Sequence, residues 1–205
     1  MSGPDFSFER AAHARGFDYV CGIDEAGRGP WAGPVVAAAV VLDPQHIPPG
    51  LNDSKKLTEA KREALYPVIM AQAQVGIGIA DVARIDRDNI LAATLWAMGE
   101  AVRSLTISPS LALVDGNRAP ALPCPAETII EGDGRSLSIA AASIIAKVTR
   151  DRTMVALDAV HPGYGFARHK GYGTAEHQTA LSKLGPCPAH RISFAPVKKA
   201  LQPTD

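Results

Sequence analysis

The feature that most constrains this chain is an apolar, strand-like run that ends on an acidic residue beside glycine, and it occurs three times. The three places are residues 23–27 (IDEAG), 114–116 (VDG) and 130–134 (IEGDG). Residues just past the strand ends of an α/β sheet line the crevice where ligands bind, and glycine there permits a sharp turn or a close ligand. The recurrence therefore predicts several carboxylates that converge at one edge of a sheet.

Converging carboxylates indicate a metal site. They repel one another unless cations neutralise them, and ligands that are all oxygen select hard ions such as Mg²⁺ or Mn²⁺. Two ions about 4 Å apart can activate a water and stabilise the leaving oxygen of a phosphodiester without a protein nucleophile. Taken singly, Asp115-Gly116 and Asp133-Gly134 are equally typical of turns. Asp24 and Glu25 would point to opposite faces of a regular strand, so we expect a bend or bulge there if both serve the site.

The hydrophobic pattern along the chain predicts an α/β fold with a parallel or mixed sheet. Strands are expected at residues 17–23, 34–42, 75–79, 111–114 and 128–130. Helices are expected at 58–73, from an N-cap at Asp88 to Leu105, and at 138–151. Pro67 should kink or shorten the first of these helices.

The length of 205 residues, of which 46% are hydrophobic, suits one domain with one core. We find no uninterrupted apolar run of about 18 residues and no export signal, so no membrane is expected as a partner. Cys21, Cys124 and Cys187 lie far apart without a C-x-x-C spacing, which favours free thiols in a reducing cytoplasm.

A net charge of zero conceals two unequal parts of the chain. Residues 1–134 carry 11 Lys and Arg against 17 Asp and Glu, whereas residues 135–205 carry 10 against 4. This division suits carboxylates that hold cations beside a basic surface that receives a polyanion, although an unevenly charged solvated surface explains it equally well.

The glycine-rich segment at residues 27–33 (GRGPWAG) invites comparison with a dinucleotide-binding loop. It is one residue too long for G-x-G-x-x-G and contains a proline, and the valine-rich residues that follow favour a strand where that motif needs a helix. The segment is therefore expected to join two strands, and a dehydrogenase is disfavoured.

Several blocks of this sequence together resemble the ribonuclease HII family. They are residues 22–30 (GIDEAGRGP), 53–57 (DSKKL), 114–118 (VDGNR), 132–133 (GD), 138–151 (SIAAASIIAKVTRD) and 164–174 (YGFARHKGYGT). The resemblance runs from about Tyr19 to Val197. It implies a ribonuclease H-like fold, a mixed sheet flanked by helices with a helical carboxy-terminal part that helps to grip the duplex, in a single domain over residues 1–205 with its core at about 17–198.

The resemblance also implies an activity. A member of this family is a metal-dependent endoribonuclease that hydrolyses the RNA strand of RNA/DNA hybrids and cuts at ribonucleotides embedded in duplex DNA, leaving 5′-phosphate and 3′-hydroxyl ends. The family's four acidic residues, which are both catalytic and metal-binding, fall on Asp24, Glu25, Asp115 and Asp133, with Mn²⁺ or Mg²⁺ as the cofactor. The strand-end pattern selects the same four residues.

Substrate contacts are carried over in the same way. Gly27, Arg28 and Gly29 would contact the 2′-hydroxyl of the ribonucleotide, by which a protein distinguishes RNA from DNA. Tyr172 matches a tyrosine that packs against the sugar of the following deoxynucleotide. The candidates for phosphate contact are Lys55, Lys56, Lys147 and Lys170, together with Arg150, although such residues on a surface are often only solvated.

Other interpretations remain open at this point. A non-catalytic nucleic-acid-binding module would share the basic surface, and another nuclease or a strand transferase on the same fold would act on DNA without ribose. The cousin family ribonuclease HIII carries an extra amino-terminal domain and lacks the Gly-Arg-Gly segment. We expect a monomer without an obligate protein partner, and we expect His169 and His190, which lack metal-ligand spacing, to be satisfied or exposed histidines.

Overall fold

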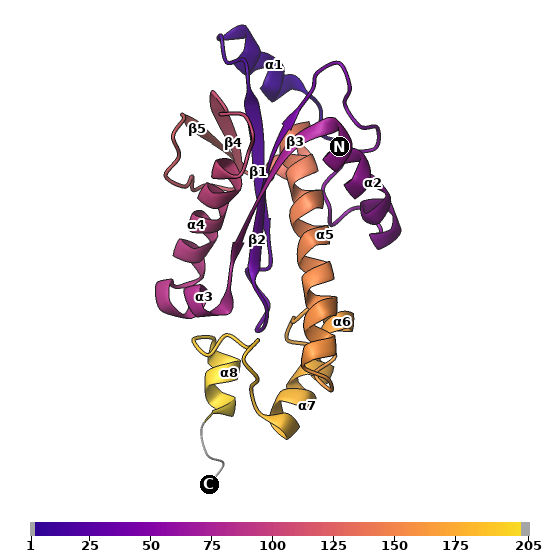
Figure 1. The fold of residues 1–205 in the computed structure, drawn as a ribbon, viewed down its shortest axis with the longest axis vertical. Helices are drawn as coiled ribbons and strands as arrows, with labels where there is room; N and C mark the ends of the chain where they lie inside the picture. Colours follow the sequence, from indigo (N-terminus) through magenta and orange to yellow (C-terminus); the bar gives the residue numbers. More distant parts are fainter. Residues whose placement is uncertain (1–2, 202–205) are drawn as a thin grey trace.

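The structure is a computed structural model that describes residues 3–201. Its fold is organised around one five-stranded sheet (Figure 1). Its strands are β1 (Val20–Ala26), β2 (Val35–Leu42), β3 (Ala73–Ala80), β4 (Leu111–Asp115) and β5 (Ala126–Ile129), in the spatial order β3-β2-β1-β4-β5. The first three pair antiparallel, whereas β1, β4 and β5 pair parallel. The sheet is therefore mixed, as the sequence predicts, and the carboxyl ends of β1, β4 and β5 lie at the same edge.

Helices cover both faces of this sheet (Figure 1). They are α1 (Ser7–Ala14), α2 (Glu59–Gln72), α3 (Val82–Asp88), α4 (Ile90–Arg103), α5 (Leu137–Val160), α6 (Phe166–His169), α7 (Ala175–Leu184) and α8 (Ala195–Ala200), with a 3₁₀ turn η1 at Gly132–Gly134. One face packs against α4, and the other packs against α5 and α2. The last three helices form a carboxy-terminal group beyond the end of the sheet, shown in yellow and orange.

The central strands are buried on both faces, which explains their continuous apolar sequence. All eight residues of β2 are buried. The odd-numbered residues from Val35 to Val41 face α4, and the even-numbered residues from Ala38 to Leu42 face α5. The alanines of α5 allow a close approach to β1. At Gly22 of β1 a Cβ atom would lie 2.1 Å from the backbone of Ser138, so this crossing requires glycine.

The predicted strands and long helices are present, with most ends displaced by a few residues, but α5 continues to Val160 where the prediction ends at Asp151. The predicted cap at Asp88 is wrong, because Asp88 is the last residue of α3 and the side chain of Asn89 accepts hydrogen bonds from the backbone of α4 instead. Pro67 lies inside α2, which continues to Gln72 and so is not shortened. Within residues 3–201, no helix is both long and apolar enough to cross a membrane.

Candidate active site

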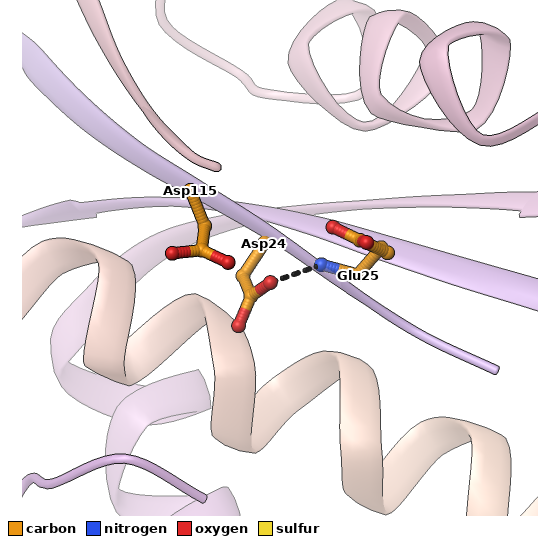
Figure 2. Close-up of side chains that lie close together, drawn as sticks. All are labelled: Asp24, Glu25 and Asp115. Atoms are coloured by element: carbon orange, nitrogen blue, oxygen red, sulfur yellow. Dashed lines mark hydrogen bonds between the residues drawn. The ribbon is translucent and has the colours of Figure 1, made fainter. Parts of the chain in front are cut away.

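Three carboxylates converge at the carboxyl ends of two parallel strands (Figure 2). Asp24 and Glu25 lie near the end of β1, and Asp115 is the last residue of the neighbouring β4. One oxygen from each side chain lies within 4.8 Å of the other two. We call these three residues the acidic cluster. Asp24 is 5% exposed and the other two are partly buried, so the cluster opens to solvent on one side.

Of the bend or bulge expected at Asp24 and Glu25, the bulge is absent. The antiparallel register of β1 with β2 runs without interruption through Asp24–Ala38 and Glu25–Ala37. The pairing of β1 with β4, in contrast, ends at Ile23 and Val114. Because β1 has no paired neighbour on this side beyond Ile23, the side chains of Asp24 and Glu25 can both approach Asp115 from the two faces of the sheet. The backbone N–H of Glu25 donates a hydrogen bond of 2.6 Å to Oδ1 of Asp24, which orients that carboxylate (Figure 2).

Asp133, the fourth acidic residue, lies beside the acidic cluster but outside the group of three. It is 6% exposed and belongs to η1, which follows β5. The turn is tied to the cluster because Gly132 N–H donates a hydrogen bond of 2.7 Å to Oδ1 of Asp115. Lys55 Nζ lies 3.6 Å from Asp133 Oδ2 and supplies a partial counter-charge.

The acidic cluster is short of positive charge. Burial, followed by the charges of Glu25 and Asp115, raises the pKa of Asp24 well above its usual value. Burial also raises the pKa of Glu25, against the opposing effect of Arg28, and the pKa of Asp133, where the charge of Asp115 adds to it. A divalent cation with oxygen ligands would remove this repulsion, so the donor set fits a hard metal ion.

The segment after β1 is shaped by a buried arginine that the sequence reasoning missed. Arg191 is fully buried and donates five hydrogen bonds to four carbonyl oxygens of this segment. The acceptors are the carbonyls of Gly27, Arg28, Pro30 and Gly33, at 2.6–3.0 Å. At least 158 residues separate donor and acceptors, so no local sequence pattern indicates the contact.

A second buried arginine joins this segment to the loop that carries Tyr172. Arg150 of α5 donates hydrogen bonds of 3.0–3.1 Å to the carbonyls of Ala32, Pro34 and Lys170. It borders the groove but is 1% exposed with its guanidinium bonded to these carbonyls, which argues against the phosphate contact for which it was a candidate. A Cβ atom on Gly27, which has φ +101°, would lie 2.0 Å from Arg150 Nε. Glycine at that position therefore allows the arginine to pass beneath the loop.

Most of the candidate substrate residues line a groove of about 230 Å³ next to the acidic cluster. Residues 27–29 form one side, and Tyr172, which is 46% exposed, lies opposite Gly29. The Arg28 guanidinium is 3.3 Å from Glu25, so it is held toward the acidic cluster.

Two of the four candidate lysines lie in this groove. They are Lys55 and Lys147, the latter paired with Asp151 at 2.8 Å. Lys56 is instead 3.7 Å from Asp53, and the Lys170 ammonium donates to the carbonyl of Ala167. Neither of these two lines the groove.

Comparisons with known proteins agree with this geometry. The family model described as ribonuclease HII matches residues 21–197. The ribonuclease HII of Azorhizobium caulinodans is 61% identical over 97% of this chain and 76% of its own length, and that of Xanthobacter autotrophicus is 60% identical over 96% and 79%. Among solved structures, the ribonuclease H2 of Pyrococcus horikoshii superposes with a TM-score of 0.73 at 26% identity, covering 89% of this chain and 96% of that one.

Proposed function

The chain belongs to the ribonuclease HII family, and from this premise we propose that its acidic cluster, together with Asp133, is the catalytic centre. The protein is a metal-dependent endoribonuclease that acts on the RNA strand of RNA/DNA hybrids. The observation that carries the assignment is the convergence of three carboxylates within 4.8 Å at the ends of β1 and β4. A module that only binds nucleic acid would gain nothing from this repulsion next to a polyanion.

Each carboxylate has a place in the proposed centre. Asp24, Glu25 and Asp115 would hold a divalent ion, Mn²⁺ or Mg²⁺, and Asp133 would complete the set from η1. When bound, such ions activate a water and stabilise the leaving oxygen of a phosphodiester, which leaves 5′-phosphate and 3′-hydroxyl ends. The hydrogen bonds to Asp24 from Glu25 N–H and to Asp115 from Gly132 N–H keep the two aspartates oriented.

The groove supports recognition of a ribonucleotide next to the metal site. Arg191 holds the carbonyls of Gly27 and Arg28, so the backbone polar groups of residues 27–29 are preorganised to meet a 2′-hydroxyl. The exposed ring of Tyr172 faces this segment across the groove and would pack against the sugar of the next deoxynucleotide. The two contacts together would allow cutting at ribonucleotides embedded in duplex DNA.

Phosphate contacts are assigned by position. Lys55 and Lys147 line the groove, and their ammonium groups would neutralise backbone phosphates of the bound duplex. Lys56 and Lys170 would act only if the duplex reached beyond the groove. We also propose that the protein acts as a monomer in the cytoplasm without an obligate partner, and gel filtration with light scattering tests the monomer.

Cleavage of three duplexes tests the proposed function. They are a DNA duplex with one ribonucleotide, an RNA/DNA hybrid and an all-DNA control, each incubated with Mn²⁺ or Mg²⁺. We expect the wild type to cut only the two that contain ribose, and both Asp24→Asn and Asp115→Asn to be inactive. Arg87→Gln is a matched control, because this residue is exposed and lies on α3 away from the groove. Equal cutting of all-DNA, or binding without cutting, would refute the assignment.

A further inference from the structure

Three buried histidines pack behind Tyr172, outside the groove. His177 is fully buried, and His190 and His169 are 1% and 9% exposed. The rings of His169 and His177 are stacked with centroids 4.5 Å apart, and Phe166 closes the group edge-on. All three imidazoles are hydrogen-bonded, so the expectation that His169 and His190 are satisfied residues is confirmed.

The partners of His177 and His190 determine where each proton lies. Nδ1 of His177 is 3.0 Å from the carbonyl oxygen of Tyr172, which can only accept, so this nitrogen carries a hydrogen. The backbone N–H of Cys187 donates to Nδ1 of His190 at 3.0 Å, and Cys187 Sγ lies 3.2 Å from the same nitrogen. A hydrogen on Nδ1 would oppose the N–H of Cys187, so we assign this nitrogen as bare. The two Nε2 atoms are 3.0 Å apart, and the neutral His190 must then donate to the neutral His177.

These bonds form one directional chain from Cys187 N–H through both imidazoles to the carbonyl of Tyr172. If His177 were protonated, its new hydrogen on Nε2 would point at the Nε2–H of His190. If His190 avoided this clash by carrying its hydrogen on Nδ1 instead, that hydrogen would point at the backbone N–H of Cys187. The chain is therefore complete in one protonation state, with both rings neutral, and its last acceptor belongs to the residue that faces the groove.

The loop at the end of this chain is held on its other side by the segment that follows β1. Gly171 accepts a hydrogen bond of 2.8 Å from Trp31 N–H, and a Cβ atom on Gly173 would lie 2.1 Å from the Trp31 ring. The Trp31 ring also packs on His177, with centroids 5.3 Å apart. Residues 171–173 therefore contact both Trp31 and His177, and a shift of either residue would move Tyr172 relative to Gly29.

We infer that the neutral His190–His177 pair is a positioning device that sets the Tyr172 ring against Gly29 and thereby determines how well the enzyme cuts at an RNA–DNA junction. The inference rests on the role proposed above for Tyr172. His177 and His190 are positioning residues, because both act through the backbone of Tyr172 and neither lines the groove.

Three variants separate positioning from folding. His177→Phe removes the donor to Tyr172 and the contact with His190. His177→Asn retains an N–H at the place of Nδ1 and so the bond to Tyr172, but it has no counterpart of Nε2 and loses the bond to His190, so its recovery should be incomplete. His13→Phe is the matched control, because His13 Nδ1 makes the same kind of bond, 2.8 Å to the carbonyl of Phe17, at the end of α1.

The measured quantity is the ratio of kcat/KM on a duplex with one ribonucleotide to kcat/KM on a continuous RNA/DNA hybrid. We expect His177→Phe to lower this ratio about tenfold, as for the loss of one buried hydrogen bond, His177→Asn to restore it to within about threefold, and His13→Phe to leave it unchanged. In a Tyr172→Ala background, His177→Phe should have no further effect on the ratio.

Several results would overturn the inference. Equal losses on both substrates, or a full effect of His177→Phe in the Tyr172→Ala background, would make the pair merely structural. A Tyr172→Ala protein with an unchanged ratio would remove the role on which the inference depends. If the wild type cut neither substrate, the proposed function itself would fail, so the two failures are distinguishable.

A measurement on the wild type applies even if His177→Phe does not fold. In ¹⁵N-histidine-labelled protein at pH 7, NMR should show Nδ1–H on His177, Nε2–H on His190 and a scalar coupling across the Nε2–Nε2 hydrogen bond. Two rapidly exchanging tautomers without that coupling would contradict the chain.

Discussion

The acidic edge of the sheet and the framework behind the groove differ in whether their buried polar groups find partners within the folded chain. At the edge, three carboxylates share a small volume with Arg28 and Lys55 as their near cations. In the framework, which we define as Arg150, Arg191, His177 and His190, the head groups are matched by carbonyls, a backbone N–H or each other. The first region is completed by a ligand, whereas the second is complete in the folded chain. A metal enzyme needs both, because a flexible frame would not hold substrate at the ions.

The largest effect should come from neutralising one member of the acidic cluster. We expect Asp24→Asn to lower kcat by about a thousandfold, because one ligand and one charge of the proposed metal site are lost. The same change should raise the thermal midpoint of the metal-free protein, because it removes repulsion from a buried carboxylate. Steady-state cleavage and calorimetry in EDTA measure the two effects. A variant that is both inactive and less stable would show that Asp24 supports the fold.

Breaking the framework should produce the opposite outcome, a large loss of stability. Arg191→Met leaves four carbonyls of the segment after β1, three of them in buried hydrogen bonds, without their donor. We expect the free energy of unfolding to fall by about 3 kcal/mol or more, measured by urea denaturation. Arg87→Met, at an exposed arginine, is the control and should change it by less than about 0.5 kcal/mol. Similar losses in both variants would mean that the buried hydrogen bonds are not the cause.

Metal addition should stabilise the acidic edge and leave the framework unaffected. At about 100 times the dissociation constant, Mn²⁺ should add about 2.7 kcal/mol to the stability of the wild type by mass action. Asp115→Asn should reduce this gain, whereas His177→Asn should not. Thermal unfolding with and without EDTA measures the gain, and an equal response of Asp115→Asn would place the ion elsewhere.

The smallest effect concerns pH and the two neutral histidines. Burial, followed by the charge of His177, lowers the pKa of His190 to about 4, and burial lowers that of His177. Because the unfolded chain binds protons near pH 6.5 and the folded chain does not, their stabilisation is present above about pH 6.5 and is lost as pH falls toward 4. Glu176, His161 and His169 act on the same pair, with Glu176 opposing the loss.

Comparison with a variant isolates the effect of the pair. The difference in unfolding free energy between the wild type and His190→Gln should shrink between pH 7 and pH 5, measured in urea with EDTA present. A constant difference would contradict two neutral, buried imidazoles in the folded protein.

Much of the fold and the acidic site was predictable because the signals are local. Continuous apolar runs indicated strands, and β2 is buried along its whole length. The acidic residues beside glycine indicated strand ends, and Asp24, Glu25 and Asp115 meet there. The cap predicted at Asp88 was wrong, because adjacent Asp and Asn both cap helices well and only the backbone geometry selects Asn89.

The sequence by itself determined the α/β class, the strand-end carboxylates and the family resemblance. Only the tertiary structure decided how consecutive residues on opposite faces of β1 reach one site without a bulge, because that depends on where β4 stops beside it. It also decided that Arg150 and Arg191 are buried frame residues and that two histidines support Tyr172. These contacts join residues far apart in the chain, and whether an arginine meets solvent or carbonyls is settled only when the segments pack together.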